Sequence, residues 1–219
     1  GVTWSNSFTS APGANSVQVR QIDLAGNTSA ASTALNFTLD ATAPTLDQTT
    51  SAVTGDTWVV SYADMGSGFS SELPATSNFT VTLYSNADLT KPTIVSVTSV
   101  RIDSINQQII LTLASAVQSG DTVQVVYTPG SGTNLKDVAG NLISATTFST
   151  SQVINKTAPA ELLNITSMSG DSGSLGTDFI TNDGTSGKVV TGTISSALRT
   201  GEVLQVSFNG GATWQTATT

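Results

Sequence analysis

The sequence predicts an all-β protein of tandem β-sandwiches with Greek-key connections, in which one complete central module is flanked by two half modules. Three observations predict this architecture. Short segments that alternate apolar and polar residues are separated by turns rich in Gly, Pro and Ser. Periodic runs of strong helix formers are missing from the chain. A pair of short motifs also occurs twice with nearly the same internal spacing, which indicates repeated modules.

The repeated pair consists of Asp-x-Ala-Gly-Asn, at residues 23–27 and 137–141, followed by Thr-Ala-Pro, at residues 42–44 and 157–159. An apolar segment lies between turn and proline each time, with Leu35, Phe37 and Leu39 in the first copy and residues 148–154 in the second. We interpret each as the last strand of a module, with the proline at the start of the next. The Gly-Asn pair is expected to supply a positive φ, so the simplest role of Asp23 and Asn27 is turn chemistry.

These boundaries divide the chain into three parts. Residues 1–44 are predicted to be the C-terminal half of a module, residues 45–157 a complete one, and residues 158–219 the N-terminal half of another. The middle part has the size of an immunoglobulin-like (Ig-like) sandwich. Its expected strands place the following residues on one inward face: Trp58, Val60 and Tyr62; Phe79, Val81 and Leu83; Ile109, Leu111 and Leu113; Val123, Val125 and Tyr127.

The last part repeats a piece of the middle one, since residues 196–208 match residues 115–127 in polarity, position for position. Both predict a turn that leads into a half-buried strand. The Asn-Gly-Gly at 209–211 then predicts a tight hairpin turn. The segment 212–214 is predicted to be a strand with no partner in the remaining residues.

Composition excludes several classes of function. Charged residues make up 10% of the chain, there is no Cys and no His, and the net charge is −8. Nucleic acid and anionic membranes both require basic patches, so neither is an expected partner. Ser-His-Asp, Cys-His and histidine-metal sites are impossible without those residues, and the acids stand singly in turns, so we expect no enzyme. No apolar run is long enough to span a bilayer, and the opening residues 1–4 suggest a piece of something longer.

The whole set of motifs resembles the bacterial Ig-like repeats of large secreted adhesins and biofilm-associated surface proteins. Residues 17–44 look like the end of such a repeat, and residues 171–181 with 209–214 look like the start of one. The central module is similar to the SwmB-type Ig-like repeat, whose Val-Gln-Val-Val-Tyr strand and Asp-x-Ala-Gly-Asn turn it carries. The resemblance implies a secreted, cell-surface extender whose modules hold an adhesive tip away from the cell.

The resemblance also implies structural calcium at the module junctions. The ligand candidates are Asp171 and Asp178 beside the linker residue Asn155, and Asp40 with Asp23 at the other junction; Asp137, in the second copy of the turn, is a further candidate. Carboxylate, amide and carbonyl oxygens are the ligands that calcium prefers. Asn155 stands where the first linker has Asp40, which removes one charge.

Two functional readings from different classes remain at this point. The first is a structural extender or filament segment. The second is a module that binds carbohydrate, such as surface glycans, or another ligand on exposed aromatic residues, with Trp4 or Trp214 as the platform. Burial of the three tryptophans would distinguish the two readings.

The two ends look like complementary halves of one module, because residues 209–219 followed by residues 1–6 form a continuous stretch of the type found inside such repeats. Each half alone would leave apolar strand faces and unpaired edges in water. We therefore expect a head-to-tail array of neighbouring copies, either as a covalent tandem repeat or as a strand-complemented filament.

Overall fold

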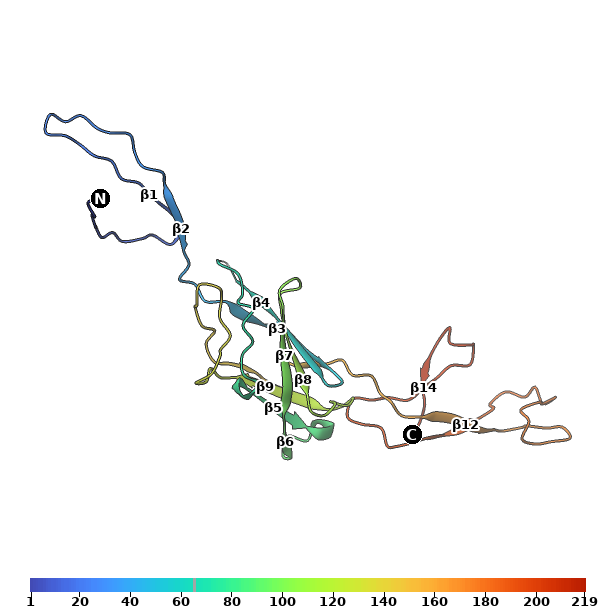
Figure 1. Ribbon diagram of the computed structural model, residues 1–219. Helices are drawn as coiled ribbons and strands as arrows, with labels where there is room; N and C mark the ends of the chain where they lie inside the picture. The colour runs from blue at the N-terminus through green and yellow to red at the C-terminus, as the bar shows by residue number, and fades with distance from the viewer. Residues whose placement is uncertain (65) are drawn as a thin grey trace.

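The computed structural model describes residues 1–64 and 66–219, and its regular structure is almost entirely β (Figure 1). The central part contains two antiparallel sheets with one parallel edge strand. The five-stranded sheet has the order β11-β3-β4-β8-β7, and the four-stranded sheet the order β10-β9-β5-β6. The strands are β3 (Thr45–Thr54), β4 (Thr57–Ala63), β5 (Phe79–Tyr84), β6 (Pro92–Val95), β7 (Val97–Asp103), β8 (Gln108–Leu113), β9 (Thr122–Tyr127), β10 (Thr146–Phe148) and β11 (Ile154–Asn155).

The chain passes from one sheet to the other after every two strands, with β3 and β4 in the first, β5 and β6 in the second, then β7 and β8, and β9 and β10. Two short 3-10 turns, η1 (Thr76–Asn78) and η2 (Ser85–Ala87), flank β5 and are the helical elements of the described residues. The predicted all-β fold is confirmed.

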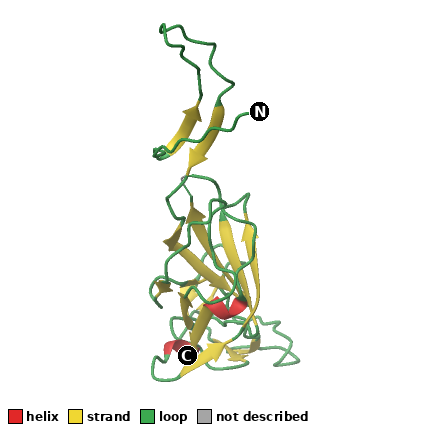
Figure 2. Cartoon of the chain, turned by 60° about the vertical axis from the view of Figure 1, so that its left-hand side comes forward, coloured by secondary structure: helices red, strands yellow, loops and turns green. Residues whose placement is uncertain are grey.

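The terminal segments extend from opposite ends of this sandwich (Figure 2). The N-terminal segment contains one hairpin, β1 (Gly13–Val17) with β2 (Leu35–Leu39). The C-terminal segment contains two strand pairs, β12 (Leu163–Met168) with β13 (Val190–Ile194), and β14 (Gln205–Val206) with β15 (Gln215–Thr216). Neither segment closes into a sandwich of its own, and the two do not meet in the described residues.

The hydrophobic core lies entirely in the central part, between Val53 and Val153. The four strands expected from alternation are β4, β5, β8 and β9, and their inward residues are buried, apart from a partly buried Leu83. These residues face the core because alternate side chains of a strand project from the same face of its sheet. The predicted core positions of the central part are therefore confirmed.

Aromatic residues tie the two sheets together. Trp58 is fully buried, donates from Nε1 to Ser51 Oγ at 2.8 Å, and packs edge-on against Phe148 with ring centroids 5.1 Å apart. The Tyr127 hydroxyl accepts the backbone N–H of Leu135 at 2.9 Å. The polar atoms of these two buried aromatic side chains thus have partners, as an apolar interior requires.

Three local predictions were wrong. The segment 212–214 is not an unpartnered strand, because it lies in the loop before β15, and β15 pairs with β14. Residues 148–154 do not form one closing strand: β10 ends at Phe148 in one sheet and β11 begins at Ile154 in the other. The turn at 209–211 is not a tight hairpin, because residues 207–214 form the loop between β14 and β15, which pair with each other. The Asn209 side chain organises that longer loop through hydrogen bonds to Thr213.

Large apolar residues are exposed in both terminal segments, and neither segment contributes a residue to the buried core. They include Val2, Trp4, Phe8, Leu24 and Leu35 at one end and Leu162, Leu163, Ile165, Phe179, Ile180, Phe208 and Trp214 at the other. Patches of this extent are expected where a module lacks the elements that would cover it. None of the helical elements in the described residues is long and apolar enough to cross a membrane.

Candidate functional site: the two module junctions

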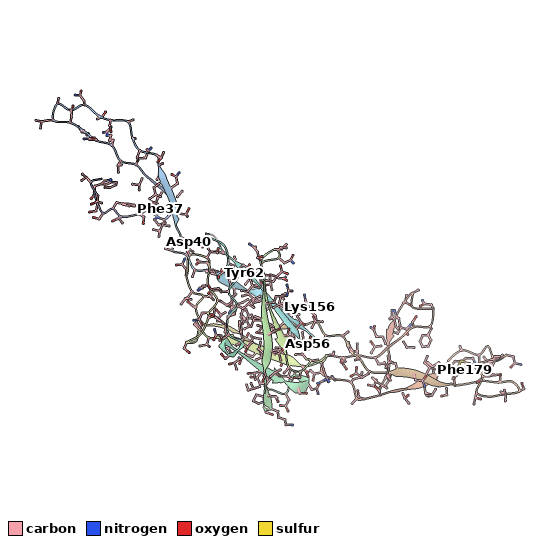
Figure 3. All side chains as sticks on the ribbon, viewed as in Figure 1. Phe37, Asp40, Asp56, Tyr62, Lys156 and Phe179 are labelled. Carbon is pink, nitrogen blue, oxygen red and sulfur yellow. The ribbon has the colours of Figure 1, made fainter. Side chains whose placement is uncertain are left out.

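Three carboxylates meet where the N-terminal segment joins the sandwich. Asp40 follows β2, Asp64 follows β4, and Asp137 begins the second Asp-x-Ala-Gly-Asn turn. One oxygen from each lies within 4.8 Å of the other two. Figure 3 shows Asp40 between the terminal hairpin and the sandwich. Asp40 and Asp64 are half-buried and Asp137 is buried.

Backbone N–H groups hold the two half-buried carboxylates in position. Asp40 accepts the N–H of Thr42 at 3.1 Å and the N–H of Ser67 at 2.6 Å. Asp64 Oδ2 accepts the N–H of Gly68 at 2.5 Å. The other oxygen, Asp64 Oδ1, is buried and has no hydrogen-bond partner among residues 1–64 and 66–219. A buried carboxylate oxygen without a partner carries a desolvation cost that a cation would offset.

Asp137 is bonded within its own turn. Its two carboxylate oxygens accept the N–H and the side-chain amide of Asn141, each at 2.7 Å. The same amide also donates to the backbone carbonyl of Asp40 at 3.1 Å. Asn141 therefore connects the linker to the turn and brings the three acids together.

The electrostatics of this cluster favour a positively charged ligand. None of the salt bridges in residues 1–64 and 66–219 includes Asp40, Asp64 or Asp137. Hydrogen bonds from the Ser67 side chain, and then from the backbone of Thr42 and Ser67, hold the pKa of Asp40 below its usual value, so that this carboxyl stays ionised. Like charges a few ångströms apart repel each other by roughly 1–4 kcal/mol per pair near a protein surface.

The structure thus joins two of the predicted ligand candidates, Asp40 and Asp137, and adds Asp64. Sequence reasoning missed Asp64, although it directly follows the strongly alternating strand β4 and precedes a Gly-Ser-Gly turn. Gly66 in that turn lies against Asp40, since a Cβ at residue 66 would overlap the Asp40 carboxylate. A close approach of this kind requires glycine.

Asp23, the predicted partner of Asp40, lies elsewhere. It is exposed in its own turn, where it accepts the N–H and the side-chain amide of Asn27, each at 2.8 Å. These are the same bonds that Asp137 makes with Asn141, which confirms the turn chemistry expected of the motif. The positive φ expected at the Gly-Asn pair is found at Gly26, at +89°.

The remaining candidates do not gather at the second junction. Asn155 donates from its side-chain amide to the carbonyls of Gln118 and Asp121, at 2.7 and 3.0 Å. Asp171 accepts the N–H of Phe179, which lies far along the C-terminal segment from Lys156 of the linker (Figure 3). Asp178 is exposed and accepts a backbone N–H two residues on. No cluster of three acids among the described residues includes any of them.

Comparison with known proteins gives one family match. Residues 39–132 match the SWM_repeat family model, described as a putative flagellar system-associated repeat. The match agrees with the repeat type expected for the central module and covers fewer than half of the residues. No curated protein matches the chain.

Solved structures of a bacterial surface-layer protein share a distant likeness with this chain. The N-terminal part of the S-layer protein SbsC is 18% identical, with a TM-score of 0.40 over 74% of this chain and 43% of that one. A longer form, rSbsC(31-844), is 18% identical, with a TM-score of 0.38 over 72% of this chain and 24% of that one. The chain therefore spans less than half the length of these proteins.

Proposed function

We propose that this chain is a structural extender segment of a bacterial cell-surface or extracellular protein, part of a filament or adhesin whose modules provide length and stiffness. The observation that carries the proposal is that both linkers are hydrogen-bonded into the central sandwich: Asp40 to Ser67 at one end and Asn155 to Gln118 at the other. Bonded linkers restrict the angle between modules. The family match over the central part and the lack of His and Cys support a structural role over catalysis.

Small-angle X-ray scattering of the 219-residue chain tests this proposal. We expect an elongated particle with the sandwich between two extended ends. A compact particle in which the terminal segments fold onto the sandwich would contradict an extender.

The positions of the three tryptophans do not favour the ligand-binding alternative. Trp58 is in the core, and Trp4 and Trp214 are exposed in segments where most large apolar side chains are exposed as well. Their exposure follows from the incomplete modules and needs no glycan to account for it.

At the first junction, the proposal includes a calcium ion held by Asp40, Asp64 and Asp137. The fit rests on the oxygen-only donor set and on the buried, unpartnered Asp64 Oδ1. The ion would offset two of the three negative charges and tie the linker acid, Asp40, to two acids of the sandwich. It would therefore fix the N-terminal hairpin against the module.

Thermal unfolding in millimolar calcium and in excess chelator tests the metal. A ligand that binds only the folded state stabilises it by about 2.7 kcal/mol at a hundredfold excess over Kd. We expect Asp64→Asn to abolish the calcium-dependent rise in Tm. Asp47→Asn, on β3 and outside the cluster, is the matched control and should retain it. Equal Tm values with and without calcium would contradict the metal proposal.

The proposal further includes completion of each terminal segment by a neighbouring copy, head to tail. In the central module residues 67 and 68 bond to the turn at 137–141, through Val138 N–H to the Gly68 carbonyl at 2.8 Å and Ala139 N–H to Ser67 Oγ at 3.0 Å, and Asp137 is buried there. The turn at 23–27 has the same internal bonds and stays exposed. Residues 158–219 of the adjoining copy would supply the missing cover and bury the apolar residues of both ends.

A polypeptide with two copies in tandem tests this completion. Trp214 of the first copy and Trp4 of the second should become protected from acrylamide quenching, whereas the outer Trp4 and Trp214 stay accessible. Equal quenching of all four exposed tryptophans would contradict it.

A further inference from the structure

The second junction contains an interaction surface that has no counterpart at the first. After β13 the chain turns back, and residues 199 and 200 meet the sandwich at the loops 85–87 and 118–121 (Figure 1). Arg199 Nη2 lies 2.5 Å from Asp121 Oδ1, and the two side chains are 16% and 3% exposed. A guanidinium of the following segment thus pairs with a buried carboxylate of the sandwich.

The guanidinium makes further hydrogen bonds to the same surface. Its Nη1 donates to Gln118 Oε1, and its Nη2 also donates to Ser85 Oγ at 3.2 Å. Asp121 is positioned for this contact by its own module, because it accepts the N–H of Asn86 at 2.8 Å and the N–H of Gln118 at 2.9 Å. Charge-assisted bonds of this kind are shorter and stronger than neutral ones.

A second contact lies beside the ion pair. Thr200 donates from its N–H to Asn86 Oδ1 at 2.6 Å and from its hydroxyl to the Asn86 carbonyl at 3.0 Å. Asn86 and Ala87 both have left-handed backbone angles, with φ of +52° and +57°. Such conformations are costly for residues other than glycine and persist where the surroundings hold them. Here the receiving loop presents both acceptors of Asn86 to the following segment.

Close packing at this surface depends on Gly120. It has a φ of +75°, and a Cβ at this position would lie 2.8 Å from Arg199 Cβ and 3.1 Å from the Thr200 carbonyl oxygen. Neither the backbone angle nor the space allows a side chain. The loop is therefore shaped for the approach of residues 199 and 200.

We propose that the second junction is locked by a cation that the protein itself carries, the Arg199 guanidinium, and is rigid without metal. The partner of the surface at Asn86, Gln118 and Asp121 is the following module, and the contact fixes the angle between the two. This inference rests on the proposed extender function. In the docked arrangement the guanidinium compensates the charge of Asp121, which is 3% exposed there, and removing that partner alone would leave a buried charge uncompensated.

Distance measurements by double electron–electron resonance test the lock in the full chain. The sequence has no cysteine, so Thr80→Cys on β5 and Asn164→Cys on β12, both at exposed positions, accept one spin label each. We expect one narrow distance distribution, identical in calcium and in excess chelator. Arg199→Gln should broaden it and remove the single peak. Arg101→Gln, which breaks an exposed pair with Asp103, should leave it unchanged.

Two results would overturn the proposal: a distribution that stays narrow in Arg199→Gln, or one that broadens in the unsubstituted chain when calcium is removed. Unfolding of the central module, followed by the fluorescence of buried Trp58, checks that the variant still folds. Gly120→Ala provides a second variant, which obstructs the docking and keeps both charges; it should broaden the distribution as well. Failure of the extender function would appear separately, as a compact particle in scattering.

Discussion

The two junctions have the same linker geometry and differ in how they handle charge. Asp40 Oδ1 accepts the N–H of Thr42, and Asn155 Oδ1 accepts the N–H of Thr157, so each side chain caps the turn that precedes its proline. The second polar atom of each side chain, Oδ2 of Asp40 and Nδ2 of Asn155, has different partners. Asp40 accepts an N–H from Ser67 within a group of acids, whereas Asn155 donates to two carbonyls.

The same linker position therefore occurs in two chemically different junctions, here also called joints. A carboxylate at the first junction adds to a cluster of three acids, for which we propose an external cation. An amide at the second satisfies carbonyls, and the nearby negative charge, Asp121, is neutralised by Arg199. The replacement of Asp by Asn thus reflects the need for a hydrogen-bond donor.

The largest expected effect comes from charge reversal at the second joint. In Arg199→Glu a carboxylate would face the buried Asp121, so residues 199 and 200 should detach from the sandwich. Breaking a buried pair typically costs about 3–5 kcal/mol. Hydrogen exchange of the Thr200 amide, bonded to Asn86 in the intact joint, measures the detachment. Arg101→Glu is the control, and protection of Thr200 that survives Arg199→Glu would show that the ion pair is not needed.

A smaller effect is expected when the linker residue itself is changed. Asn155→Asp removes the donor that satisfies the carbonyls of Gln118 and Asp121, and places a negative charge near them. A hydrogen bond of this kind typically contributes about 0.5–1.5 kcal/mol. Chemical denaturation of the chain should show this loss both in calcium and in chelator. Stabilisation of Asn155→Asp by calcium would instead mean that the two joints are interchangeable.

A third substitution should affect the first joint alone. Gly66→Ala keeps all three carboxylates and forces the Asp40 carboxylate away from its position. Displacing a ligand through its neighbour typically weakens metal binding by 10-fold to 100-fold. Calcium titration by calorimetry measures this change. Gly184→Ala, where a Cβ meets nothing, is the control.

The sequence was sufficient to predict four strands of the central part, β4, β5, β8 and β9, because burial on one face leaves a period of two. Trp58, Val60 and Tyr62 on β4 show this pattern and are buried. Strand β7 has a weaker pattern, since of its residues only Val100 is buried, and the alternation of the sequence does not predict it. The strands of the terminal segments were predicted less well, because the pairing of β14 and β15 depends on the shape of the 207–214 loop.

The candidate site residues could likewise be predicted only where their contacts are local in sequence. The turn motif correctly predicted the bonding of Asp23 and Asp137, because those hydrogen bonds are local in sequence. The grouping of Asp40 with Asp64 and Asp137 depends on the pairing of distant strands, which no motif encodes. The contact of Arg199 was not predictable for the same reason, since its partner Asp121 is distant in sequence.

The smallest expected effect is the response of the first joint to acid. The pKa of Asp40 is lowered, chiefly by the Ser67 side chain and then by the backbone N–H of Thr42. A carboxyl with a lowered folded pKa contributes stability above its unfolded pKa, and that stability is lost as the pH falls through the folded value. Calcium requires the ionised form, so protons compete with the metal only in that range.

We therefore expect the calcium-dependent rise in Tm to be constant from neutral pH down to about pH 5 and to decline below the ordinary Asp value of about 3.9. Thermal unfolding over this range, with and without calcium, measures the decline. In Asp40→Asn the part of the decline that belongs to Asp40 should disappear, because the amide does not titrate. If the calcium-dependent rise in Tm already vanishes near pH 6, the ligands are groups with raised pKa values. Asp40 would then be excluded as a ligand. A decline confined to the acid range would instead link calcium to the same linker acid that distinguishes the first joint from the second.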